Sequence, residues 1–187
     1  GQFSFALFEG TTDYGEMLIC DGANKPFFFK MTGTGALSDR TFFAGEITVD
    51  STTAPTVGVI HENHFVVGGA PTAKNKIFFS ATLDPESFSG TGSGSIQLTD
   101  AIVGLASFRS DLIIFCKNSI FKLINISDSS NIAIVPITQN VGCLDGNSIQ
   151  EIGGDLLFLS PDGIRTVAGT ARIGDVELSS VSRQIQK

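Results

Sequence analysis

A short hairpin pattern recurs four times along this chain. Residues 153–169 read GGDLLFLSPDGIRTVAG, in which two apolar runs flank a Ser-Pro-Asp-Gly turn. A matching run begins 44 residues earlier at Asp111, another 47 residues before that at His64, and another a further 48 residues back at Glu16. A nearly constant period is typical of repeat folds, in which each unit buries its apolar surface against its neighbours. These four copies constrain the fold more than any other feature of the sequence.

Each copy is predicted to contain four short β-strands. First strands are expected at 5–8, 57–60, 102–105 and 148–152. Second strands are expected at 16–20, 64–68, 111–115 and 155–159. Third strands are expected at 26–29 and 76–79 and in the runs that contain Ile120 and Ile164. Fourth strands are expected at 46–49, 95–98, 132–135 and 176–178.

Four strands in about 45 residues match one blade of a β-propeller. A small sheet cannot bury both faces alone, and radial stacking covers each sheet with its neighbours. The second strands are continuous apolar runs, as expected of strands covered on both faces. We therefore predict an all-β fold, a β-propeller or propeller arc of about four four-stranded antiparallel blades, closed or part of a larger ring. The blades are placed at approximately 1–50, 51–99, 100–138 and 146–180 of a single domain, 1–187.

The turn-forming residues Gly, Ser, Thr and Asn recur at short intervals, and the sequence has almost no stretch with the apolar period of a helix. Segments 11–16 and 68–76 have the composition of loops. The Gly/Ser-rich stretch 87–95 lies between two strands of one repeat, which favours a surface loop over a flexible linker. The chain opens on Gly1 and not on Met, so we expect it to be a portion of a longer protein.

The chain is acidic, with 12 Lys and Arg against 19 Asp and Glu, a net charge of −7 and a pI near 4.7. Binding to nucleic acid through many phosphate contacts needs clustered cations, which the sequence lacks. The same balance argues against an anionic membrane surface. No apolar run approaches the roughly 20 residues of a spanning helix. The first ten residues lack the basic segment of a signal peptide.

Three cysteines, Cys20, Cys116 and Cys143, are present without CxxC spacing. Cys20 and Cys116 lie in apolar strand-like runs. Because a free cysteine packs as a small apolar side chain, we predict that all three are reduced core residues.

Two motifs invite a functional interpretation. The sequence His61-Glu62-Asn63-His64 superficially resembles the zinc motif HExxH, but its second histidine comes one residue early and the segment lies at a strand-to-strand turn. Exposed turn histidines are therefore expected. Ser160-Pro161-Asp162-Gly163 resembles the Asp-box of glycosidase propellers, but its glycine follows Asp162 directly and the chain has no Trp. We interpret it as a tight turn in which Gly163 supplies a positive φ.

The remaining candidates predict no chemistry. Asp84 and Glu86 are expected in a solvated loop and not as a pair of glycosidase carboxylates. Asp13, Asp21 and Asp39 are predicted turn residues, since no calcium-loop pattern surrounds them. The glycines of 90–95 fit neither a nucleophile elbow nor a phosphate-binding loop. We predict no catalytic, cofactor-binding or metal-binding residue, no cofactor and no enzymatic activity.

Three segments carry a resemblance to a known family. KIFFSATLDPESFSGTGSGSIQL, DAIVGLASFRSDLIIFCKNSIFKL and GGDLLFLSPDGIRTV resemble propeller segments of tail proteins from short-tailed bacteriophages, both the nozzle-type tail tubular proteins and the related DNA-stabilisation proteins. LICDGANKPFFF is similar to an LLxxDGxNxPxxY-like hairpin of that family, with Phe28 or Phe29 at the aromatic position. The resemblance spans most of residues 15–168, and it carries over no catalytic residue.

The resemblance implies a structural virion protein of the phage tail. It implies a homo-oligomeric ring, six-fold in this family, with tail adaptor and tail fibre proteins as further partners. Such a ring would form part of the channel for genome ejection, and DNA would pass through it without specific binding. An acidic wall suits that role because it does not hold phosphates. No membrane partner is expected, and the implied location is the tail of the virion.

Two other functions remain open at this point. One is a carbohydrate-binding or hydrolysing propeller, such as a receptor-binding component of a tail, but sugar-stacking aromatics are scarce because the chain has no Trp and only Tyr14 as a tyrosine. The other is a general protein-interaction propeller. Its Trp-Asp and kelch signatures are missing, although a Gly153-Gly154 pair is present.

Overall fold

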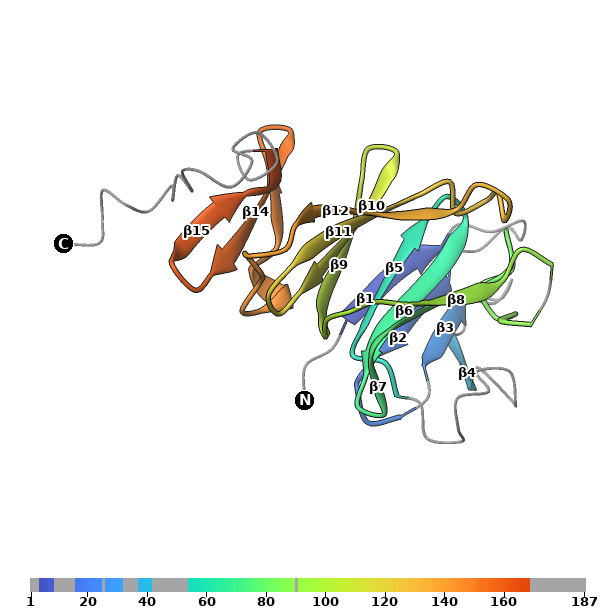
Figure 1. Cartoon of the computed structure of the whole chain (residues 1–187). Coiled ribbons are helices and arrows are strands. Elements are labelled where there is room, and N and C mark those ends of the chain that lie inside the picture. The colour runs from blue at the N-terminus through green and yellow to red at the C-terminus, as the bar shows by residue number, and fades with distance from the viewer. Residues whose placement is uncertain are drawn as a thin grey trace. The chain divides into compact units, whose positions relative to one another are not determined.

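The structure, a computed structural model, describes residues 4–8, 16–24, 26–31, 37–41, 54–89 and 91–168 (Figure 1). These residues form fifteen strands and one short 3-10 turn, η1, at Gly146–Ser148. The strands make four antiparallel sheets, three with four described strands and one with three. In each sheet the strands follow one another in sequence order, which is the up-and-down meander of a propeller blade. The predicted fold class is confirmed.

The four sheets are referred to as blades 1 to 4. Blade 1 contains β1 (Ser4–Phe8), β2 (Glu16–Cys20), β3 (Phe27–Met31) and β4 (Leu37–Thr41). Blade 2 contains β5 (Val57–His61), β6 (His64–Ala70), β7 (Ala73–Phe79) and β8 (Gly94–Gln97). Blade 3 contains β9 (Ile102–Phe108), β10 (Asp111–Cys116), β11 (Ile120–Ile124) and β12 (Ala133–Thr138). Blade 4 contains β13 (Gln150–Ile152), β14 (Asp155–Ser160) and β15 (Gly163–Thr166).

Contacts divide the chain into two compact units. Unit 1 contains residues 1–101 and the loop 125–131, and unit 2 contains residues 102–124 and 132–187. Blades 1 and 2 therefore belong to unit 1, and blades 3 and 4 to unit 2. Each described sheet lies within one of the four predicted blade ranges. The single domain remains a prediction.

The core of unit 1 forms where blade 1 packs on blade 2. Along β1 and β2 alternate side chains face blade 2, because successive residues of a strand point to opposite faces. The buried cluster combines apolar residues of both sheets with one from the loop after β7: Phe8, Leu18, Cys20, Phe65, Val67, Phe78 and Phe88. The rings of Phe65 and Phe88 meet edge to face with centroids 6.4 Å apart.

The core of unit 2 is built in the same way from blades 3 and 4. Its buried cluster contains Ile113, Phe115, Ile120, Val141, Cys143, Leu156, Phe158 and Val167. The rings of Phe115 and Phe158 lie 5.3 Å apart between centroids, one from each blade. Both units thus bury one face of each sheet against the next, as the repeat in the sequence predicts.

The second strands differ in how completely they are covered. All of β6 is buried, and β10 is buried from its second residue onward, so the expectation of two covered faces is confirmed there. It is wrong for blades 1 and 4. Met17 in β2 is 41% exposed and Leu159 in β14 is 38% exposed, whereas their sequence neighbours Leu18 and Phe158 are buried.

One predicted element is corrected by the structure. Segment 68–76 is not a loop, because β6 continues to Ala70 and β7 begins at Ala73. The sequence misleads because Gly69 adopts a φ of 70° at a bulge in the β6–β7 ladder, so a glycine-rich run fits within the strands. In blade 1 the fourth described strand is Leu37–Thr41. The strands predicted at 46–49 and 176–178 lie outside the described residues, as does the loop predicted at 11–16 apart from Glu16, where β2 begins.

Other predictions are confirmed. The first, second and third strands of all four blades lie within a few residues of their expected positions, although β7 begins three residues early. The stretch 87–95 is a loop up to the start of β8, apart from Gly90, which lies outside the described residues. Cys20, Cys116 and Cys143 are buried, and none of them is in a disulfide. Burial is the main cause that raises the pKa of both Cys20 and Cys143, so these thiols resist ionisation.

Candidate functional site

The two histidines flank a two-residue hairpin turn in blade 2. Glu62 and Asn63 have φ values of 46° and 63°, the backbone of a type I′ turn, and His61 pairs with His64 across the ladder. The expectation of exposed histidines is wrong, because His61 is 3% exposed and His64 is fully buried. Because only Glu62 and Asn63 form the turn, His61 and His64 are the last paired residues of the β5–β6 ladder.

His64 is held by polar groups on both ring nitrogens. Its Nδ1 lies 2.6 Å from the carbonyl oxygen of Ser80, and a carbonyl only accepts, so Nδ1 carries a proton. Its Nε2 lies 3.2 Å from the Thr82 hydroxyl and 3.3 Å from the Ser127 hydroxyl. The Phe79 ring meets the imidazole edge to face at 6.1 Å. These contacts hold the ring in one orientation.

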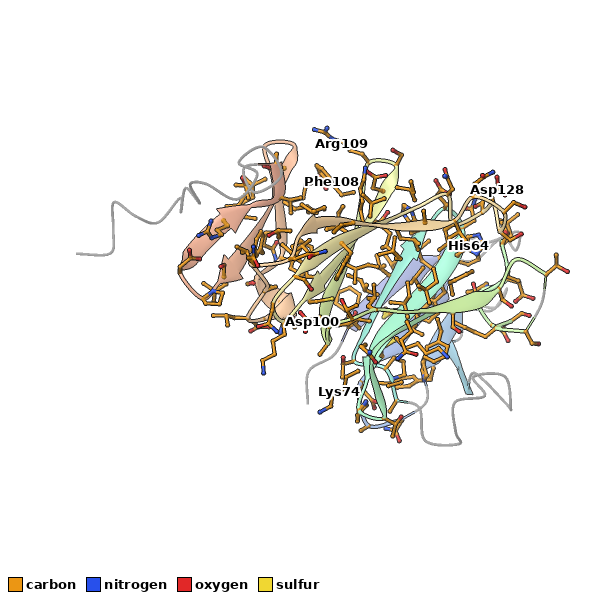
Figure 2. The ribbon with its side chains drawn as sticks, in the orientation of Figure 1. His64, Lys74, Asp100, Phe108, Arg109 and Asp128 are labelled. Carbon is orange, nitrogen blue, oxygen red and sulfur yellow. The ribbon has the colours of Figure 1, made fainter. Side chains whose placement is uncertain are left out.

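Ser127 belongs to the loop 125–131, which connects β11 to β12 in sequence and is part of unit 1. Its hydroxyl also lies 3.3 Å from Glu62 Oε2, so it contacts both the turn and the imidazole. The loop is held internally by Asp128, whose carboxylate accepts from the Ser130 amide at 3.0 Å and from the Asn131 side chain at 2.6 Å. Figure 2 shows His64 and Asp128 toward the same end of unit 1.

This cluster contains a serine, a histidine and a glutamate, the residue types of a hydrolytic triad, but in another arrangement. In a triad the acid orients the imidazole and the serine lies free to attack. Here a backbone carbonyl orients His64, and the Ser127 hydroxyl lies between the imidazole and Glu62. The fully buried His64 also leaves no room for a substrate at Nε2. The contact holds loop 125–131 on the β5–β6 hairpin.

The Ser-Pro-Asp-Gly segment is the turn between β14 and β15, as predicted. Ser160 pairs with Gly163, whose φ of 121° is in the region that glycine favours. The sequence interpretation missed Arg165, which is 2% exposed and whose Nε donates to Asp162 Oδ1 at 2.8 Å. Its guanidinium also pairs with the second oxygen of Asp162. The Asp-x-x-Arg spacing could have indicated this pair.

The Asp162–Arg165 pair stabilises the turn and leaves little for a ligand. The Ser160 hydroxyl donates to Asp162 Oδ1 at 2.7 Å, so one carboxylate oxygen accepts from both the serine and the arginine. Burial lowers the pKa of the Arg165 guanidinium, which still remains a cation at neutral pH. The fork-to-carboxylate contact is the strongest described polar anchor of blade 4.

The other acidic candidates are structural where the structure describes them. Asp84 and Glu86 lie in the loop after β7, and Asp84 Oδ1 accepts from the Glu86 amide at 3.3 Å. Asp21 caps a turn after β2 through the amides of Ala23 and Asn24, and the Asn24 side chain is the largest cause that lowers the pKa of Asp21.

Asp39 is not a turn residue as predicted, because it lies in β4 and pairs with Phe29. The polar sequence Leu37–Thr41 resembles a turn, but polar residues are tolerated in the outer strand of a sheet. Asp13 lies outside the described residues. Within the described ranges, no group of three or more His, Cys, Asp or Glu side chains could hold a metal ion.

Most of the Lys and Arg side chains that the structure describes contact other groups of the same chain. The side chains of six Lys and Arg are described, against eleven Asp and Glu. Four of the six contact other groups: Lys76 lies 5.0 Å from the Phe78 ring, Arg109 donates to the Gly154 carbonyl at 2.9 Å, Lys122 lies 3.2 Å from Asp111, and Arg165 pairs with Asp162. Figure 2 shows Arg109 at the tip of the β9–β10 hairpin. No described surface therefore gathers free cations for a phosphate backbone.

Comparison of the sequence with models of known protein families and with curated proteins finds no match. In the part of the chain that the structure describes, no helix has the length and apolar character needed to cross a membrane.

Proposed function

We propose that this protein is a structural component of the tail of a short-tailed bacteriophage, a nozzle-type subunit. Copies of it assemble into a ring, a hexamer by the family resemblance, that lines part of the channel through which the genome leaves. Tail adaptor and tail fibre proteins are its neighbours in the virion. It is not an enzyme and uses no cofactor.

The observation that carries this proposal is the blade type. The segments that resemble nozzle-type proteins contain hairpin strands of the sheets: the LICDGANKPFFF segment contains parts of β2 and β3, and the GGDLLFLSPDGIRTV segment contains all of β14 and β15. The likeness therefore includes the hairpins that define a blade, together with the loop between β7 and β8.

The charge distribution supports passage of DNA without binding. Cations that neutralise phosphates hold DNA in place, and each phosphate contact strengthens binding at low salt. In this chain the acidic side chains outnumber the basic ones, and most described cations contact the protein itself. A wall of this kind repels the duplex and lets it move.

The direct test is the location of the chain. Phage particles that encode it are purified and labelled with gold-conjugated antibody to this chain, with antibody to the major capsid protein as the control. Label at the tail vertex is the expected result, together with portal and terminase genes beside the gene for this chain. Absence of the chain from purified particles would reject the proposal. Label at fibre tips with binding to host glycans would favour a receptor-binding propeller instead.

A further inference from the structure

Blade 1 exposes an apolar face. Phe5 and Leu7 in β1 are each 70% exposed, and Met17 in β2 is 41% exposed. Antiparallel pairing sets Phe5 opposite Ile19 and Leu7 opposite Met17, so the four side chains share one face of the sheet. The opposite face of the same strands packs on blade 2 (Figure 1). The four side chains form a contiguous apolar patch, which on a protein surface marks an interaction site.

Blade 4 exposes an apolar face as well. Ile152 is 59% exposed, Leu159 is 38% exposed and Ile164 is 41% exposed. Leu159 pairs with Ile164 across the β14–β15 ladder, and Leu157 shares their face because it lies two residues from Leu159. The opposite face of β14 packs on blade 3. Blades 1 and 4 therefore each have one face in the core of their own unit and one exposed apolar face.

A position rule tells these two faces apart. The second strands begin at Glu16, His64, Asp111 and Asp155, and positions are counted from those residues. In each unit the earlier blade packs on the later one through positions 3 and 5, which are Leu18 with Cys20 and Ile113 with Phe115. The later blade packs on the earlier one through positions 2 and 4, which are Phe65 with Val67 and Leu156 with Phe158.

By this rule the two exposed faces are complementary, because each corresponds to a different side of the blade-to-blade contact. Met17 and Ile19 occupy positions 2 and 4 of blade 1, the face that elsewhere receives an earlier blade. Leu157 and Leu159 occupy positions 3 and 5 of blade 4, the face that elsewhere packs on a later blade. One chain thus carries both halves of a blade-to-blade contact, and each half includes side chains that are exposed to solvent in the described residues.

We propose that the exposed face of blade 4 in one copy packs on the exposed face of blade 1 in a second copy. The contact repeats the sheet-on-sheet packing inside each unit and buries side chains that are otherwise in water. It joins two different surfaces, so copies associate head to tail and close into a ring or extend as a chain. The proposed contact supplies a subunit interface for the ring of the proposed function. It rests on the exposed faces and not on the tail assignment.

A second copy fits these faces better than a peptide or a lipid surface. A peptide or a lipid surface would need one apolar face, and it would explain neither the second face nor their complementarity. On blade 1 the four side chains of the face are uncharged, so covering them desolvates no ion. A second copy also supplies both faces in equal number.

The test uses two variants that each block one face. Leu7→Glu places a carboxylate on the blade 1 face, and Leu159→Glu places one on the blade 4 face. Leu83→Glu is the matched control, since Leu83 is 48% exposed in a loop of blade 2. Circular dichroism and thermal melting check that all three variants fold. Sedimentation velocity then measures association of the parent chain, of each variant and of an equimolar mixture of the two face variants.

The parent chain and Leu83→Glu are expected to form oligomers, and each face variant alone is expected to associate about tenfold or more weakly, because a carboxylate would be buried unpaired. The equimolar mixture is expected to form a one-to-one dimer, since each variant keeps the face that the other has lost. A mixture that stays monomeric overturns the proposal. So does a parent chain that is monomeric at about 100 μM, where a contact of even modest affinity is populated, or a loss of association in only one of the two face variants.

Discussion

Residues of one strand can lie on opposite faces of the sheet, and the face decides how much each side chain contributes to stability. In β14, Leu156 is 3% exposed and packs in the core of unit 2, whereas Leu159 is 38% exposed on the outer face. The sequence presents both as members of one apolar run. Only the pairing of sheets decides which of them is covered.

This difference predicts a graded stability series. Leu156→Ala and Leu112→Ala each remove a buried side chain, and each should lower the free energy of unfolding by about 2–5 kcal/mol. Leu159→Ala makes the same chemical change on an exposed face and should cost well under half as much. Denaturant melts measure all three. Near-neutral effects at both buried sites would mean that the alignment of the blades is wrong.

Some residues were beyond sequence-based prediction for a physical reason. The contact of His64 with Ser127 joins residues that lie 63 positions apart, and no local pattern encodes it. The histidines looked exposed because turns usually are, but a two-residue turn leaves its flanking residues in the sheet. Arg165 and Asp162 lie only three residues apart, so this pair could have been predicted from the sequence.

At the scale of elements, most strands were predictable, including the fourth strands β8 and β12, but the bulge in β6 and the strand β4 were not. A continuous apolar run locates a second strand because burial on a pleated surface selects such residues. The bulge at Gly69 and the polar strand Leu37–Thr41 escaped prediction because both resemble loops in composition. Their structure depends on neighbouring strands and not on their own sequence.

The turns that contain Asp21 and Asp128 should make the stability of the fold depend on pH in the acid range. Asparagine side-chain hydrogen bonds are the largest cause that lowers the pKa of both Asp21 and Asp128 below the usual 3.8. A lowered pKa in the folded state adds stability above pH 3.8, and this stability is lost as the pH falls through the folded pKa. The melting temperature should therefore fall on acidification below pH 3.8, and less steeply in the double variant Asp21→Asn, Asp128→Asn.

The matched variants for this test keep both carboxylates. Asn24→Ala with Asn131→Ala removes the side-chain bonds that lower the two pKa values and should flatten the acid slope in the same direction. Thermal melts from pH 2 to pH 5 provide the comparison. If the parent and both double variants share one slope, the two turns do not contribute to acid stability.

At the scale of the whole molecule, the repeat predicted four antiparallel blades, and the structure confirms them. The sequence did not reveal which faces remain uncovered. All four second strands are apolar, and exposure on blades 1 and 4 depends on what packs beside them. The covering partner is a property of the assembly, so one chain's sequence does not encode it locally.

The charge of the whole molecule predicts its behaviour toward DNA. With a net charge of −7 the chain should not retard linear duplex DNA, either at about 150 mM salt or at lower salt where screening is weaker. Gel retardation or fluorescence anisotropy measures this. Binding that tightens steeply as salt is reduced would reveal a cation cluster and would contradict a passive channel wall.

We propose that copies of this chain form a ring around the genome exit channel. Cryo-electron microscopy of intact particles that encode it tests this most directly. The expected result is density for the four blades in every subunit of a ring below the portal, surrounding the channel axis. Density for this chain only at the fibres, or only in single copies away from the axis, would contradict it.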